Sequence, residues 1–334
     1  MTKAGRSKTD TSHKHDALCL GVDLGGTNIK LALVTRDGDI VKKTSVATQA
    51  AKGPDHVLTR IAEHGLKLAG QAPAGAKVLC AGVGCPGPLN SKTGVVFEAP
   101  NMGWRNVEAK RVLTDLMKMP VFVNNDANAA AWGEYWAGAG RGSTIMVCIT
   151  LGTGIGGGLV IDGKLFKGAS DSGAEFGHQT IDFNSPFPCY INCGALEDHA
   201  SATAVNRLAR AAVRSGEKTC LTLDPGDPSR PTARDVYEAA KKGDALANRL
   251  MDEVGFYLGV GLANIINMLN PDRIVFTGGM AASWDRLSGP ALAEARKRSF
   301  QRSFEVCDVR LGGLWEDAGV IGAAGLGMVA CDPA

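Results

Sequence analysis

Short apolar runs separated by turn residues fill the first part of the chain, a pattern typical of buried strands. The run at 18–24 ends in Gly25 and Gly26, which predicts a strand that enters a tight turn. Two further strands are expected at 30–34 and 40–48, and the three together predict an antiparallel meander.

Helices and strands then alternate. Apolar residues at helical spacing predict a helix over 54–70, and a buried strand is expected at 78–83. A helix over 105–117, a strand at 121–125 and a helix over 127–136 follow.

The second part of the chain has the same character. Strands are predicted at 144–150, 157–161 and 273–277, and a last helix, rich in small residues, at about 317–330. Residues 216–231 are rich in Pro, Gly and Asp, so we expect a surface loop there.

This order predicts a duplicated α/β protein with a cleft between its halves. We expect residues 1–17 to be a disordered tail, and 18–125 to form a smaller α/β domain. Residues 126–316 form a larger α/β domain, and the last helix at about 317–330 returns to the smaller one.

Composition supports a globular protein, because 45% of the 334 residues are hydrophobic and 21% are charged. Lys and Arg number 36 against 34 Asp and Glu, and a balance this even argues against a nucleic-acid surface. No apolar run is long enough to suggest a membrane span. The nine cysteines lie mostly in apolar segments, so we expect reduced thiols and a cytoplasmic location.

Glycine-rich turns follow three of the predicted strands, and the first two of these turns could bind phosphate. The turn at 23–27 combines glycines and a threonine hydroxyl with the carboxylate of Asp23, which could reach a magnesium ion. The turn at 152–158 is neither a Walker loop nor a dinucleotide fingerprint. A third turn, at 277–279, could lie against a nucleotide base or ribose. The alternative for each is an ordinary hairpin or bulge, but two such turns in a duplicated pattern favour phosphate binding.

Asp126 follows an apolar strand and is the candidate general base. Phosphoryl transfer to a hydroxyl needs one base near the attacking oxygen, together with electrostatic clamping of the phosphate. The alternative is that Asp126 only caps the following helix. Four further side chains, of the planar polar kind that binds sugar hydroxyls, are Asn101, Glu175, His178 and Glu197.

Several of these stretches together resemble the ROK family (repressors, open reading frames and kinases), and within it the bacterial glucokinases. The matching stretches are GVDLGGTNIKLALV, GVGCPGPLN, APNMGW, NNDANAAAWGE, LGTGIGGGLVIDGK, GAEFGH, LEDHAS and NPDRIVFTGG. The resemblance implies an actin-like, ribonuclease-H-like pair of α/β domains. It also implies ATP-dependent phosphorylation of a hexose, with glucose the first candidate, and a homodimer or larger homo-oligomer.

The resemblance assigns roles residue by residue. It gives Asp126 the role of the general base. The family's sugar contacts correspond to Asn101, Asn125, Glu175, His178 and Glu197. Its phosphate loops and adenosine motif correspond to Gly25, Gly26, Thr27, Thr153, Gly154, Gly278 and Gly279.

One departure concerns zinc. The family usually carries a motif Cys-x-Cys-Gly-x-x-Gly-Cys-x-Glu, but here Pro188 and Ala195 stand where its first and last cysteines belong. Cys189 and Cys193 remain, and with His178 they are three ligands where structural zinc takes four. We therefore expect ATP and Mg²⁺ but no zinc, unless a further residue completes a rearranged site.

Three functions compete at this point. A sugar kinase accounts for the base and the phosphate turns together. A repressor is disfavoured because only about 17 polar residues precede the first strand, and a silent sugar sensor is disfavoured because Asp126 and both turns are present. Within kinases, fructose, mannose or N-acetylmannosamine as acceptor and polyphosphate as donor stay open.

Overall fold

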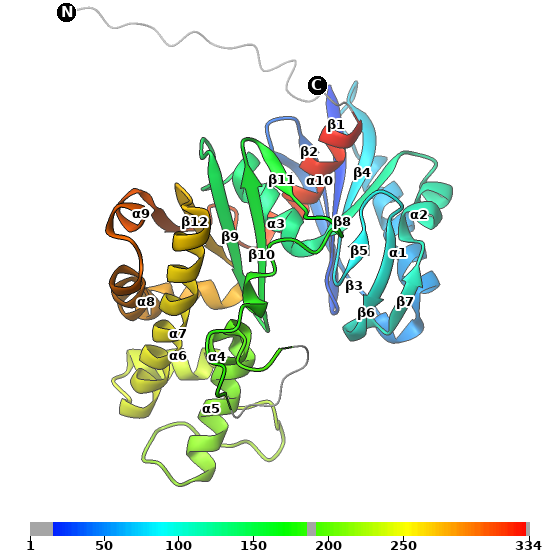
Figure 1. Cartoon of the computed structure of the whole chain (residues 1–334). Coiled ribbons are helices and arrows are strands. Elements are labelled where there is room, and N and C mark those ends of the chain that lie inside the picture. The colour runs from blue at the N-terminus through cyan, green and yellow to red at the C-terminus, as the bar shows by residue number, and fades with distance from the viewer. Residues whose placement is uncertain (1–15, 186–191, 332–334) are drawn as a thin grey trace, which may run out of the picture. The chain divides into compact units, whose positions relative to one another are not determined.

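The computed structural model describes residues 16–185 and 192–331 (Figure 1). These residues form two compact units. Unit 1 contains the described residues up to Ala129 together with those from Gly319 onward, and unit 2 is Ala130–Ala318. Most of the predicted tail at 1–17 lies outside the described residues, and the first strand already includes Ala17.

Unit 1 is built on a five-stranded sheet of order β3-β2-β1-β4-β8. Its strands are β1 (Ala17–Leu24), β2 (Asn28–Thr35), β3 (Ile40–Ala47), β4 (Lys77–Cys85) and β8 (Val121–Asn125). The predicted antiparallel meander of β1, β2 and β3 is confirmed. Strands β1, β4 and β8 run parallel, so their carboxyl ends lie at the same edge of the sheet.

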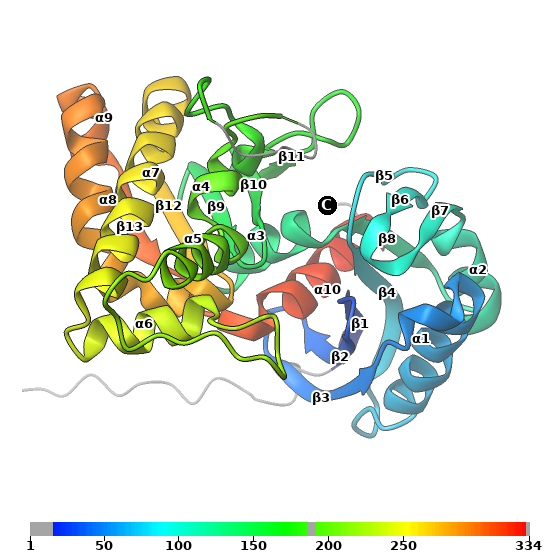
Figure 2. The same cartoon turned by 90° about the horizontal axis from the view of Figure 1, so that it is seen from below.

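Helices cover both faces of this sheet (Figure 2). They are α1 (Pro54–Ala69), α2 (Ala109–Met117), the start of α3 (Asp126–Trp136), and α10 (Ala318–Cys331), with a 3₁₀ turn η2 (Ala50–Lys52) before α1. Helix α10 lies very close to the central strands. A methyl group at Gly82 would lie only 1.8 Å from the carbonyl oxygen of Ala323, and one at Gly21 only 2.1 Å from that of Val320.

The predicted helix over 105–117 is wrong in its first residues. A small antiparallel sheet occupies this region, formed by β5 (Leu89–Asn90), β6 (Val95–Ala99) and β7 (Trp104–Val107), with a 3₁₀ turn η3 (Pro100–Met102) between the last two. Trp104 and Val107 are buried and pair with Ala99 and Val96 of β6. Pairing with a neighbouring strand decides the conformation here, and α2 begins only at Ala109.

Unit 2 repeats the topology of unit 1. Its sheet has the order β11-β10-β9-β12-β13. The strands are β9 (Ile145–Leu151), β10 (Ile155–Ile161), β11 (Lys164–Phe166), β12 (Arg273–Thr277) and β13 (Asp308–Leu311). As in unit 1, three strands form an antiparallel meander and the last two run parallel to the central one, which confirms the predicted duplication.

The helices of unit 2 bury an apolar core against this sheet, and α7 and α8 lie side by side in both views (Figures 1 and 2). They are α4 (Leu196–Ala200), α5 (Ala202–Arg214), α6 (Ala233–Lys241), α7 (Ala245–Leu269), α8 (Trp284–Arg298) and α9 (Gln301–Val306), with 3₁₀ turns η4 (Phe176–His178), η5 (Gly279–Ser283) and η6 (Trp315–Asp317). The loop predicted at 216–231 connects α5 and α6. In the described part of the chain, no helix is both long and apolar enough to cross a bilayer.

The buried carboxylate of Glu134 is a feature that the sequence did not single out. It accepts hydrogen bonds from the backbone N–H groups of Ala139 at 2.9 Å, Gly313 at 2.9 Å and Leu314 at 3.0 Å. A fully buried carboxylate is costly unless it is hydrogen-bonded. These three bonds satisfy Glu134 and join α3 to the segment that follows β13.

We expect Gly82→Ala to lower the free energy of unfolding by at least about 2 kcal/mol, because the new methyl group must displace α10. Chemical denaturation measures this. Gly289→Ala is the matched control: Gly289 is exposed inside α8 with no atom within 4 Å of an added methyl group, so it should raise stability by about 0.5–1 kcal/mol. Equal behaviour of the two variants would contradict the close packing of α10.

Candidate functional site

The carboxyl edge of the unit 1 sheet brings two predicted site carboxylates together. Asp23 lies at the end of β1 and pairs with Gly84 of β4, while Asp126 directly follows β8. Both carboxylates act on the thiol of Cys85 at the end of β4. Burial raises the pKa of Cys85 far above its usual range, and the charges of Asp126 and Asp23 raise it further.

Asp126 begins α3, but the helix is capped by its neighbour. The amide oxygen of Asn125 accepts the backbone N–H of Asn128 at 3.1 Å, which is the usual N-cap bond. The amide nitrogen of Asn125 donates to the carbonyl of Gly87 at 3.4 Å. Asn125 is therefore already engaged within unit 1, whereas the carboxylate of Asp126 accepts the N–H of Ala127 at 2.9 Å.

The first of the two turns predicted to bind phosphate, at 25–27, is held in place by a buried threonine. Thr48, which has no exposed surface, donates its hydroxyl to the carbonyl of Gly25 at 2.6 Å and its backbone N–H to Thr27 at 2.8 Å. Gly26 is exposed, and no atom lies within 4 Å of where its side chain would begin. The turn thus presents open backbone at Gly26, as an approaching phosphate requires.

Asn101 is held at the surface by two buried residues that follow it in the chain. It is exposed in the middle of η3, while Met102 and Trp104 are 4% and 1% exposed and anchor the segment in the core of unit 1. This anchoring was not expected from the sequence, because the small sheet that contains Trp104 and the turn that contains Met102 were not predicted.

The carboxylate of Asp23 lies in a poorly hydrated position. Burial raises the pKa of Asp23, and the neighbouring charge of Lys30, its cross-strand partner, partly lowers it. A methyl group added at Gly319 would lie 2.9 Å from this carboxylate, so α10 passes directly beside it. One carboxylate beside a phosphate turn suits Mg²⁺, which is commonly held by one or two carboxylates, waters and the substrate's phosphates.

In unit 2, three of the predicted sugar contacts gather near η4 and α4. Glu175 stays solvent-accessible, yet the surrounding protein displaces enough water to raise its pKa; His178 lowers the pKa of Glu175 and Glu197 raises it again. These effects require the three side chains to lie near one another. Glu197 also accepts the backbone N–H of Ile155 at 2.7 Å through its Oε2 atom.

The second turn predicted to bind phosphate, at 152–158, is held by the first residues of α5. Ala202 donates its backbone N–H to the carbonyl of Gly152 at 2.9 Å, and the hydroxyl of Thr203 donates to that of Thr153 at 2.7 Å. Thr153 is itself exposed. Thr203 was not singled out from the sequence, since it lies 50 residues from its partner.

The third turn follows β12 and lies against the neighbouring strand. Gly278 has a positive φ of 92°, and a methyl group there would lie 2.3 Å from the carbonyl of Leu151 at the end of β9. Only glycine satisfies both conditions. Gly279 is exposed, with no atom near its missing side chain. Thr153, Gly154, Gly278 and Gly279 therefore all follow parallel strands of one sheet.

The region where the family usually has its zinc motif is joined by hydrogen bonds. The Asn192 amide donates to the carbonyl of His178 at 2.8 Å and to the Thr180 hydroxyl, while Leu196 donates its backbone N–H to Gln179 at 2.9 Å. These bonds connect η4 to α4 and so position Glu197.

The expectation of reduced thiols is wrong at one position. Cys193 is disulfide-bonded, whereas the other seven described cysteines are free. A disulfide sulfur is not a thiolate, so Cys193 in this state is not a zinc ligand. Cys189 and Pro188 lie outside the described residues, and the absence of zinc stays a prediction.

The pH dependence of stability tests the state of Asp23. Because burial raises its pKa above the unfolded value, the folded protein holds this proton more tightly. The stability that Asp23 contributes is therefore complete below about pH 4 and is lost as the pH rises through its folded pKa. We expect Asp23→Asn to gain thermal stability relative to the wild type between pH 4 and pH 7.

The control is Asp252→Asn, which makes the same chemical change at an exposed position of α7. Its melting temperature relative to the wild type should not vary over this range. If the melting temperature of Asp23→Asn relative to the wild type also does not vary with pH, Asp23 is fully hydrated.

Known proteins resemble this chain over nearly its whole length. A family profile described as ROK family matches residues 19–328. The chain is 39% identical over 315 residues to a glucokinase of Halalkalibacterium halodurans, covering 93% of this chain and 95% of the relative. It is also 30% identical over 318 residues to a xylose repressor of Caldicellulosiruptor bescii, covering 94% of this chain and 78% of the repressor.

A solved structure extends the likeness to three dimensions. The structure of a ROK family glucokinase from Streptomyces griseus in complex with glucose and AMPPNP matches with a TM-score of 0.77 at 32% identity, over 93% of this chain and 99% of that one. The actin-like, two-domain α/β fold implied by the sequence is thereby confirmed. On sequence and fold together, this chain belongs to the ROK family.

Proposed function

We propose that this protein is a kinase that transfers the γ-phosphoryl group of ATP to a hexose, with glucose as the first acceptor to test. The observation that carries the proposal is the position of Asp126. Its carboxylate starts a helix that Asn125 already caps, and it shares a sheet edge with Asp23 of the phosphate turn. Relatives named glucokinase cover more than nine-tenths of this chain at 37–39% identity, which supports the same conclusion.

In this reaction a sugar hydroxyl attacks the γ-phosphorus, Asp126 takes the hydroxyl proton, and ADP leaves. The turns at 25–27 and 152–154 offer backbone N–H groups to the phosphates, and the turn at 278–279 takes the nucleoside. Magnesium, when bound, offsets the negative charge of the transferring phosphate, and Asp23 is the residue proposed to hold it.

The candidate sugar contacts are proposed for each unit by itself. Unit 2 offers the cluster of Glu175, His178 and Glu197, in which the charges of His178 and Glu197 both act on the pKa of Glu175 and therefore lie near it. Unit 1 offers the exposed Asn101. Asn125 is the weaker member of this set, since its amide is already bonded at both ends within unit 1.

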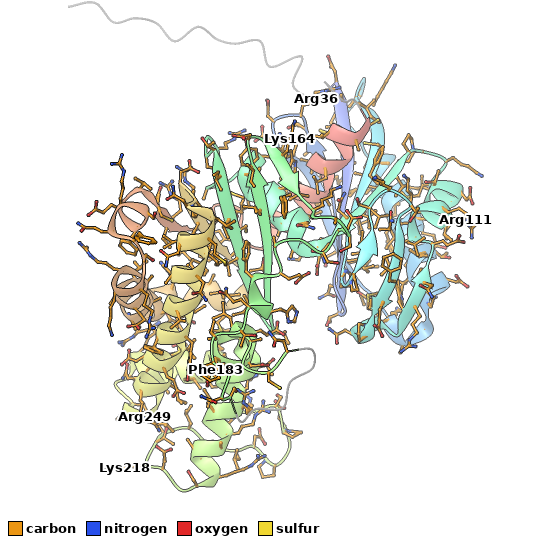
Figure 3. The ribbon with its side chains drawn as sticks, in the orientation of Figure 1. Arg36, Arg111, Lys164, Phe183, Lys218 and Arg249 are labelled. Atoms are coloured by element: carbon orange, nitrogen blue, oxygen red, sulfur yellow. The ribbon has the colours of Figure 1, made fainter. Side chains whose placement is uncertain are left out.

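A kinase for another hexose or for N-acetylmannosamine, and a sugar-sensing repressor, are the alternatives. A repressor needs clustered positive charge to bind DNA. This chain instead has 36 Lys and Arg against 34 Asp and Glu, and the cations that Figure 3 labels come from different segments of the chain. The labelled cations are Arg36, Arg111, Lys164, Lys218 and Arg249.

We further propose that the protein is cytoplasmic and that it forms a homodimer or a larger homo-oligomer.

We expect Asp126→Asn to lower kcat by roughly 10²- to 10⁴-fold while glucose still binds, because an amide cannot accept the proton. A coupled ADP-release assay measures kcat, and calorimetry measures glucose binding. Asp252→Asn, which makes the same chemical change at an exposed position of α7, is again the control and should keep wild-type turnover. Near-normal turnover of Asp126→Asn would reduce Asp126 to a structural residue.

Substrate choice is tested by a panel of hexoses and amino sugars, with ATP or polyphosphate as the donor. We expect ADP release to be fastest with glucose and to require Mg²⁺ but not added zinc. Elemental analysis of the same protein should find zinc near background. A preference for another sugar would keep the kinase and change its acceptor, whereas no turnover with any sugar would favour the sensor.

A further inference from the structure

Glu197 contacts the second phosphate turn directly, although the resemblance to the ROK family implies that it binds the sugar. Its Oε2 atom accepts the N–H of Ile155 at 2.7 Å, and Ile155 is the first residue of β10, immediately after the turn. Its other oxygen, Oε1, accepts no hydrogen bond from any described residue. Glu197 therefore holds the turn with one oxygen and has the second available for a ligand.

The Glu197 carboxylate leaves no room for a side chain at position 154, where the chain has glycine. A methyl group there would lie 2.0 Å from Oε2 of Glu197, far inside contact distance. Its φ lies outside the left-handed region, so the backbone conformation does not demand glycine. Gly152, two residues earlier in the same turn, differs: an added methyl group would have no neighbour closer than 3.9 Å.

The residues that follow Glu197 complete the connection. The chain passes from α4 through Ser201 into α5, where Ala202 and Thr203 bind the carbonyls of Gly152 and Thr153. The turn is thus bonded at three residues, 152, 153 and 155, to the single segment 197–203. A displacement of Glu197 must move the turn, and a displacement of the turn must move Glu197.

We propose that Glu197 couples the two substrate sites: a sugar hydroxyl bound to its Oε1 fixes the turn that receives the phosphates of the nucleotide, and bound phosphate in return fixes Glu197 for the sugar. The proposal rests on the proposed function, since it needs a sugar at Glu197 and a nucleotide at the turn. Coupling of this kind is reciprocal, so each ligand must strengthen the binding of the other by the same factor.

The alternative is that the turn serves the nucleotide alone and Glu197 the sugar alone. The two views differ for a change made only in the turn. If Glu197 links the sites, Gly154→Ala must weaken glucose binding even when no nucleotide is present. If the sites are independent, the same change weakens only the binding of ATP.

The experiment measures the Kd of glucose by calorimetry, first without nucleotide and then with a non-hydrolysable ATP analogue. We expect Gly154→Ala to raise the nucleotide-free Kd of glucose about tenfold or more, the usual effect of losing a hydrogen bond to a charged group. In Gly154→Ala, the ATP analogue should strengthen glucose binding little or not at all. Gly152→Ala, the matched control, should leave the nucleotide-free Kd within about twofold of the wild type.

A double substitution isolates the link. Glu197→Ala removes the carboxylate and makes room for the methyl group, so adding Gly154→Ala to it should weaken glucose binding no further. Independent residues would instead give additive losses. An unchanged nucleotide-free Kd for Gly154→Ala, or additivity in the double variant, overturns the proposal.

Two further measurements distinguish a wrong coupling proposal from a variant that does not fold and from a wrong choice of acceptor sugar. If Gly154→Ala does not fold, the affinity of Glu197→Ala for the ATP analogue without sugar replaces it: a weaker affinity supports the link and an unchanged one overturns it. If the wild-type protein binds no glucose, the acceptor in the proposed function is wrong, and the same comparison is made with the hexose that drives ADP release.

Discussion

The close approach of α10 to the central strands is the constraint on which unit 1 depends. The helix backbone lies against β1 and β4 where these strands carry Gly21 and Gly82, and no side chain fits between them. The first turn of α10 then passes beside the carboxylate of Asp23 at Gly319. A change in the seating of this helix would therefore alter the sheet edge that presents Asp23 and Asp126.

Unit 2 uses the same device, but its glycines make room for side chains and for backbone carbonyls outside helices. Gly154 makes room for the Glu197 carboxylate, Gly157 for the ring of Phe176 and the carbonyl of Ala174, and Gly177 for the carbonyl of Ile155. Each glycine removes a side chain so that η4 and α4 can approach the β9–β10 hairpin. The glycine-rich segment therefore serves packing, in addition to the ligand binding that we propose for it.

Carboxylates in this protein fall into two electrostatic classes. Glu134 is buried but receives three backbone hydrogen bonds, so its charge is stabilised by the fold. Asp23 lies in a position where burial opposes its charge. A charge that the fold leaves undercompensated is available to a cation or a proton, which suits a ligand site better than a structural one.

The sequence by itself determined the meander, the duplication, the glycine turns and the position of Asp126. These follow from apolar periodicity and turn residues, which act over a few neighbours along the chain. Tertiary structure alone decided that residues 104–107 form a strand, that Asn125 rather than Asp126 caps α3, and that Glu134 joins α3 to Gly313. It also decided that Glu197 contacts a turn 42 residues away. Hydrogen bonds and steric contacts between distant residues leave no periodic signal, so only the folded chain reveals them.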